Sequence, residues 1–156
     1  MLENWLANGA PAKAIEPLSP QINTQVANWE TFLNGISNKQ RLMSRYIYEH
    51  LYLAHIYFDE IDSAGKPPVY FRLVRSATPP GTPIKVIATR RPYSDPGTNT
   101  FWYRLWRDQM SVVEKTHLPY ALNKQRKSNW TEWFLDEDYE AGALPSYEPA
   151  IAGNPF

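Results

Sequence analysis

The stretch SRYIYEHLYLAHIYF, residues 44–58, is the most informative segment of this 156-residue chain. No proline occurs between Pro20 and Pro67, so a helix can run through it, and we expect one from Lys39 to Phe58 with Asn38 as its N-cap. At 100° per residue, one side of this helix is largely apolar: Met43, Ile47, His50, Ala54 and Phe58. The opposite side combines aromatic rings with charges: Arg41, Arg45, Tyr48, Tyr52, His55 and Asp59. A helix with so few plainly solvated positions is predicted to be buried on most sides.

The residues before this helix predict a lead-in and a shorter helix. Residues 1–20 contain three prolines and a glycine and are expected to be irregular. A short helix is predicted from Val26 to Leu33, ended by the Asn34-Gly35 pair. Residues 21–156 are then expected to form a single domain, since a segment of this length is of the usual size for one domain.

After residue 65 the hydrophobic period changes to that of strands. Strands are predicted at four places, the last two as a hairpin: Val69–Val74, Ile84–Thr89, Phe101–Trp106 and Ser111–His117. A last short helix is expected from Trp130 to Leu135, capped by Ser128. Helices first and strands afterwards indicate an α+β fold. It should have two N-terminal helices, a mainly antiparallel sheet of about four strands and a short C-terminal helix.

Composition limits the possible functions. The chain has no cysteine, which excludes disulfides, thiolate metal sites and a covalently attached c-type haem on this chain. No apolar run is long enough for a membrane-spanning helix, and no signal peptide is visible. Net charge is zero, but residues 66–127 hold 12 basic and 3 acidic side chains, while residues 128–156 hold 6 acidic and no basic ones. The basic middle could face an anionic surface such as phospholipid head groups, or the acidic tail could fold back over it. No nucleic-acid partner is expected.

The three histidines do not predict a metal site. His50 and His55 are five residues apart, so a regular helix separates them by roughly 140° and they cannot bind one ion together. His50 is expected to be a neutral, hydrogen-bonded core residue. His55 shares its side of the helix with tyrosines, and His117 ends a predicted strand where a loop begins. We therefore take His117 and His55 as the candidate catalytic residues.

Arginines and tyrosines supply the candidate substrate-binding residues: Arg75, Arg90, Arg91, Tyr48 and Tyr52. An arginine can bind a phosphate or carboxylate through two parallel hydrogen bonds. Ion pairs with the acidic run at residues 136–138 are the plainer alternative for these arginines. Arg72 and Arg75 are three residues apart, so a regular strand points them to opposite faces.

Several segments, in order along the whole chain, resemble the bacterial fatty acid cis/trans isomerases. The longest is FRLVRSATPPGTPIKVIATRRPYSDPG at residues 71–97. The others are NWLANGAP (4–11), SRYIYEHLYLAHIYF (44–58), KTHLPYAL (115–122), LPSYEP (144–149) and GNPF (153–156).

The resemblance implies an enzyme that converts cis double bonds of membrane phospholipid acyl chains to trans, in membrane adaptation and stress response. It further implies a periplasmic location and a c-type haem on a Cys-x-x-Cys-His motif. An electron-deficient iron could draw π density from the bond and permit rotation, since hard chemistry of this kind belongs to cofactors.

This chain lacks that motif and looks like a C-terminal segment of a larger protein, so we expect no activity from it alone. Its expected partners are phospholipid acyl chains and the haem-bearing part of the same protein. We expect it to build the lipid-binding part of the enzyme. The alternative is a non-catalytic module that docks onto the membrane or a partner.

Overall fold

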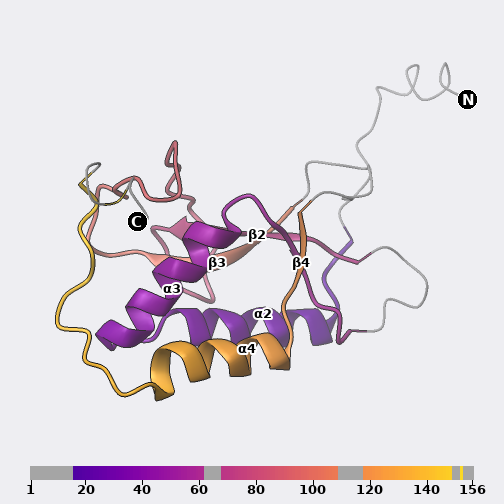
Figure 1. Ribbon diagram of the computed structural model, residues 1–156. Helices are drawn as coiled ribbons and strands as arrows, with labels where there is room; N and C mark the ends of the chain where they lie inside the picture. Colours follow the sequence, from indigo (N-terminus) through magenta and orange to yellow (C-terminus); the bar gives the residue numbers. More distant parts are fainter. Residues whose placement is uncertain (1–15, 62–67, 109–117, 149–151, 153–156) are drawn as a thin grey trace, which may run out of the picture.

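The computed structural model describes residues 16–61, 68–108, 118–148 and 152. Its elements are, in order, α2 (Pro20–Leu33), α3 (Asn38–Leu51), β1 (His55–Tyr57), β2 (Phe71–Ser76), β3 (Trp102–Arg107), β4 (Pro119–Ala121), α4 (Lys124–Thr131) and the π-helical turn η1 (Glu132–Asp136). In the view of Figure 1, α2 and α4 lie along the lower side of the molecule and α3 crosses above them, in front of the sheet. This arrangement confirms the α+β prediction.

The four strands form one mixed sheet in the order β3-β2-β1-β4. Strand β2 pairs antiparallel with β3 over its whole length, from Phe71 opposite Arg107 to Ser76 opposite Trp102. Strand β1 pairs antiparallel with β2 and parallel with β4. The sheet is therefore mainly antiparallel, as predicted.

The long helix predicted to reach Phe58 ends at Leu51, so that prediction is wrong. Tyr52 and Leu53 form a turn, and the chain then enters β1, where the His55 amide donates to the Leu118 carbonyl at 2.9 Å. An apolar run of this kind is compatible with both a helix and a buried strand, and only a distant pairing partner decides between them. Helix α2 starts earlier than predicted, at Pro20, because the Ser19 hydroxyl accepts the Ile22 amide and proline suits the first turn.

Two predictions on the C-terminal side also need correction. Helix α4 begins at Lys124, with the Asn123 side chain accepting the Arg126 amide at 2.9 Å, so Ser128 is not the cap. Residues 84–89 form no full strand but a single bridge, Val86 opposite Ser76. The physical reason is that β1 pairs with the Phe71 end of the same edge of β2, which leaves residues 84–89 only the Ser76 end. The predicted strand at residues 111–117 lies outside the described residues.

The core packs α2 and α3 against the sheet. Its most buried side chains include Trp29, Met43, Ile47, Ile56 and Phe71. On α3 the buried positions extend to Ser44, Arg45, Tyr48 and Leu51. The buried face is thus rotated toward Arg45 and Tyr48, which leaves His50 exposed, with its Nδ1 2.8 Å from the Tyr46 carbonyl oxygen. The prediction of a core His50 was wrong for this reason.

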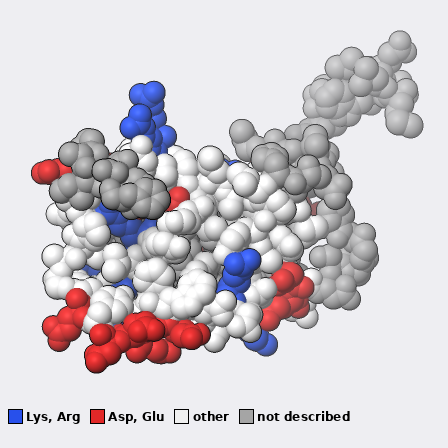
Figure 2. Space-filling model, viewed as in Figure 1, with Lys and Arg blue, Asp and Glu red and all other residues white. Residues whose placement is uncertain are grey.

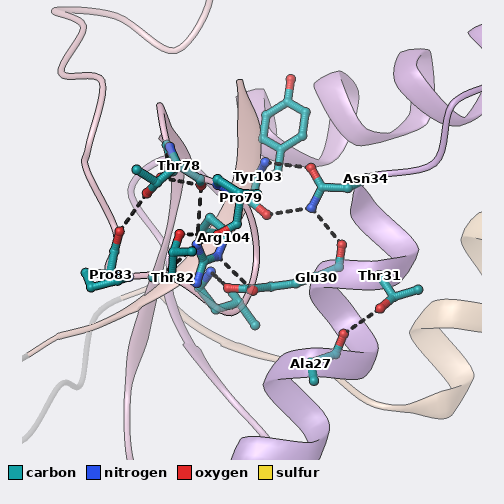
Figure 3. A network of polar contacts seen from close by, with 12 residues as sticks. Ala27, Glu30, Thr31, Asn34, Thr78, Pro79, Thr82, Pro83, Tyr103 and Arg104 are labelled. Carbon is teal, nitrogen blue, oxygen red and sulfur yellow. Dashed lines mark hydrogen bonds and ion pairs between the residues drawn. The ribbon is translucent and has the colours of Figure 1, made fainter. Parts of the chain in front are cut away.

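Side chains of α2 cover the outer edge of β3, which is the end strand of the sheet (Figure 3). Glu30 accepts the Leu105 amide at 3.0 Å and the Arg104 Nε at 2.8 Å. One helical turn later, Asn34 accepts the Tyr103 amide at 2.9 Å and donates to its carbonyl at 2.8 Å. The unpaired backbone N–H and C=O groups of an end strand can pair with other chains, and here side chains of α2 form hydrogen bonds with these groups instead. Within the described ranges, no helix has the length and apolar character needed to cross a membrane.

Candidate functional site

A groove of about 580 Å³ lies between α3 and α4, and we call it the α3–α4 groove. Its walls are mostly apolar and aromatic and include Tyr46, Ile47, Tyr120, Trp130 and Trp133. The mouth carries large apolar side chains that are unusually exposed: Leu53 (60%), Leu118 (59%), Trp133 (54%) and Tyr46 (40%). In Figure 2 the surface above α4 is largely uncharged, while acidic side chains gather along its lower edge.

The aromatic walls of the groove are held by contacts between rings. The Tyr46 ring lies 3.9 Å from that of His50 and 5.0 Å from that of Phe134. The rings of Tyr120 and Trp130 are parallel, with 6.4 Å between their centroids. Such rings present a large apolar surface at little cost in conformational entropy.

A second cavity, of about 530 Å³, lies at the edge of β2, and we call it the sheet-edge cavity. It lies between the end of β1, which pairs with Phe71, and Ile87, whose amide donates to the Arg75 carbonyl at 2.9 Å. It brings together four of the candidate residues predicted from the sequence: Tyr48, Tyr52, His55 and Arg75. Tyr52 and Leu53 line both cavities, so the two adjoin.

His55 forms a buried pair with Asp108 in the sheet-edge cavity. The His55 Nδ1 lies 3.2 Å from the Asp108 Oδ2, and both side chains are almost fully buried. A carboxylate on one ring nitrogen fixes the orientation of an imidazole and allows it to hold or move a proton. Asp108 was not predicted, because only the pairing of β1 and β3 with β2 brings it near His55. The other candidate, His117, lies outside the described residues.

Arg75 is completely buried, so its guanidinium faces the protein and not a ligand. It donates to the carbonyls of Ser94 at 2.7 Å and Pro92 at 3.0 Å, and it lies over the Tyr48 ring at 4.4 Å. Burial raises the pKa of the Tyr48 hydroxyl, an effect that the positive charge of Arg75 only partly offsets. Within the described residues, arginines form carboxylate ion pairs only in Arg45–Glu49 and Arg104–Glu30.

The acidic tail does fold back, but onto α3 and through backbone carbonyls. Asn38 donates to the Ala141 carbonyl at 2.9 Å, and Lys39 donates to the Glu137 carbonyl at 2.5 Å. Arg45 donates to the Ser146 carbonyl at 3.2 Å. The idea that the predicted arginines pair with acids 136–138 is therefore wrong for the arginines that the structure describes.

Arg90 and Arg91 are exposed and line neither cavity. The Arg91 guanidinium lies 5.8 Å above the Tyr93 ring. Of the groove residues the sequence predicted only Tyr52 as a site residue, and it missed the exposed Leu53, Leu118 and Trp133. Their only signal was the high aromatic and apolar content, since the turn before β1, the residue before β4 and η1 are far apart in the chain.

Replacing Tyr52 by alanine should destabilise the chain by about 2–4 kcal/mol, because the half-buried ring packs edge-on against Tyr48 and its hydroxyl donates to the Thr89 carbonyl at 2.6 Å. Thermal unfolding followed by circular dichroism measures this loss. Tyr46→Ala is the control, since that ring is 40% exposed and should cost much less. Equal melting temperatures for Tyr52→Ala and the wild type would contradict the assigned packing.

The family model for fatty acid cis/trans isomerase matches residues 1–156 of the chain. No curated protein and no solved structure matches it.

Proposed function

The chain belongs to the fatty acid cis/trans isomerase family, and from this premise we propose that the α3–α4 groove holds the acyl chain whose double bond is isomerised. An unsaturated hydrocarbon chain offers no charge to recognise, so its binding must come from burial of apolar surface. The observation that carries the proposal is a groove of about 580 Å³ with apolar and aromatic walls, well within the size range of small-ligand sites.

We propose that the whole enzyme acts on phospholipid acyl chains in the periplasm and that this chain is its lipid-binding part. The sheet-edge cavity adjoins the groove at Tyr52 and Leu53. His55, held by Asp108, therefore stands beside the path of the acyl chain and remains a candidate catalytic residue, as does His117. Exposed Arg90 and Arg91 remain candidates for contact with the phosphate. Arg75 does not, because it is buried against carbonyls.

A c-type haem does not fit the residues of this chain. There is no cysteine for covalent attachment. No group of three or more metal-ligating side chains occurs in the part of the chain that the structure describes. We therefore propose that any haem is held by another part of the protein.

Binding of oleic acid, an acid with one cis double bond, tests the groove. Trp133→Ser should weaken binding by about tenfold, because it removes a groove wall whose ring is half-exposed and contributes little to folding. Trp106→Ser is the matched control, since that tryptophan is 43% exposed and lines the sheet-edge cavity instead. Isothermal titration calorimetry gives both dissociation constants. Equal loss in the two variants, or no binding by the wild type, would overturn the assignment of the groove.

Turnover is tested in cells that make the full-length protein and no trans fatty acids of their own. Gas chromatography of their phospholipid fatty acids should show trans product with the parent protein and none when residues 1–156 are made alone. Trans product from residues 1–156 alone would refute the proposal that this chain needs the haem-bearing part.

A further inference from the structure

Two exposed leucines stand side by side at the mouth of the α3–α4 groove. Leu53 lies in the turn that enters β1, and Leu118 directly precedes β4. The two strands are parallel partners, and the Leu118 carbonyl accepts the His55 amide at 2.9 Å, so both turns open at the same end of the sheet. About 60% of each leucine is exposed to solvent.

Leu118 is also strained. Its φ of 49° makes it the non-glycine residue with a left-handed backbone among those the structure describes. That conformation is unfavourable for a residue with a bulky side chain, whereas glycine and asparagine adopt it readily. An exposed leucine in this conformation gives up folding stability twice, through backbone strain and through an apolar side chain left in water. Both features coincide at the groove, which Leu118 lines together with Leu53.

We propose that Leu53 and Leu118 form a membrane-inserting tip that opens the α3–α4 groove directly onto the acyl region of a phospholipid bilayer. This inference rests on the proposed function, because an acyl chain can pass from a bilayer into the groove only if the groove mouth meets the bilayer. Exposed apolar side chains mark sites of protein or membrane contact, and Trp133 and Tyr46, which line the same groove, are residue types that favour the membrane interface.

The charges around the mouth fit insertion by apolar contact more than attraction to anionic lipid. Glu49 lines the groove but pairs with Arg45 at 2.8 Å. The Arg126 guanidinium lies 4.4 Å over the Tyr120 ring. The acidic side chains in Figure 2 gather along the lower edge, below the uncharged surface. Binding should therefore depend little on salt, and neutral phosphatidylcholine should serve as well as phosphatidylglycerol.

The test measures co-sedimentation with dioleoylphosphatidylcholine vesicles for Leu118→Asn, Leu53→Ser and the control Ile36→Ser. Ile36 is 93% exposed in the α2–α3 turn and does not line the groove. Each tip variant should bind vesicles about tenfold more weakly, and Ile36→Ser should bind like the wild type. Leu118→Asn should melt at or above the wild-type temperature, because asparagine relieves the strain. A residue kept for folding would behave in the opposite way.

Calorimetry with oleic acid separates this inference from the proposed function. The tip variants should lose far less affinity for the free acid than for vesicles, since the two leucines lie at the mouth of the groove and its aromatic walls stay intact. Loss of oleic acid binding in the wild type would refute the groove assignment itself. Normal oleic acid binding together with wild-type vesicle binding by Leu118→Asn would overturn only the membrane tip. Gel filtration that shows a dimer of the wild type and a monomer of the tip variants would also overturn it, in favour of an interface between two copies of the chain.

Discussion

Replacing Glu30 by alanine is expected to lower the free energy of unfolding by about 3–5 kcal/mol, which is the usual cost of removing one partner from a buried ion pair. The Glu30 side chain serves two groups at once: it accepts the Arg104 Nε at 2.8 Å and the Leu105 amide at 3.0 Å (Figure 3). Both carboxylate and guanidinium are nearly fully buried. Its loss leaves the charge of Arg104 with only carbonyl partners and leaves the edge of β3 unpaired at Leu105.

The measurement is thermal unfolding, in which a loss of this size lowers the melting temperature by roughly 10–15 °C in a chain of this length. Glu30→Gln keeps an acceptor for the Leu105 amide but removes the negative charge, so it should lie between alanine and the wild type. Glu140→Gln, at an exposed position, is the control and should change little. If Glu30→Ala has the same melting temperature as the wild type, the buried pair does not stabilise the packing of α2 against the sheet.

The second large effect is expected at Arg75, where methionine should cost about 2–4 kcal/mol. Methionine has a similar length but no donors, so the half-buried carbonyls of Pro92 and Ser94 lose their partners. Arg75→Lys should rescue the stability only in part, because an ammonium cannot reproduce the planar fork or its contact with the Tyr48 ring. Urea unfolding of the three proteins measures the difference.

The same variants decide between two roles for Arg75. If Arg75 is a buried anchor, Arg75→Met should lower the free energy of unfolding and leave the oleic acid affinity of the folded protein unchanged. Arg90→Met is the control for loss of a positive charge at an exposed position. An Arg75→Met protein that is as stable as the wild type, but no longer binds lipid, would restore Arg75 as a substrate-binding residue.

The sequence determined the fold class and the family, since these depend on features that recur along the whole chain. Helical periodicity before residue 60 and strand periodicity after it were enough to predict the α+β fold and a mainly antiparallel sheet. The opposite faces of Arg72 and Arg75 also followed from the two-residue period of a strand, with Arg75 buried and Arg72 half-buried.

Only the tertiary structure decided where α3 ends, what Arg75 contacts and where a ligand can lie. Residues 52–58 suit a helix as well as a strand. Parallel pairing with β4, far along the chain, places residues 55–57 in the sheet. The turn at residues 92–94 folds over the guanidinium of Arg75 and removes it from solvent. The α3–α4 groove and its leucine tip exist because β1 and β4 bring two distant turns together. Local sequence fixes the propensity of each segment, whereas burial and cavities depend on contacts between segments that are far apart in the chain.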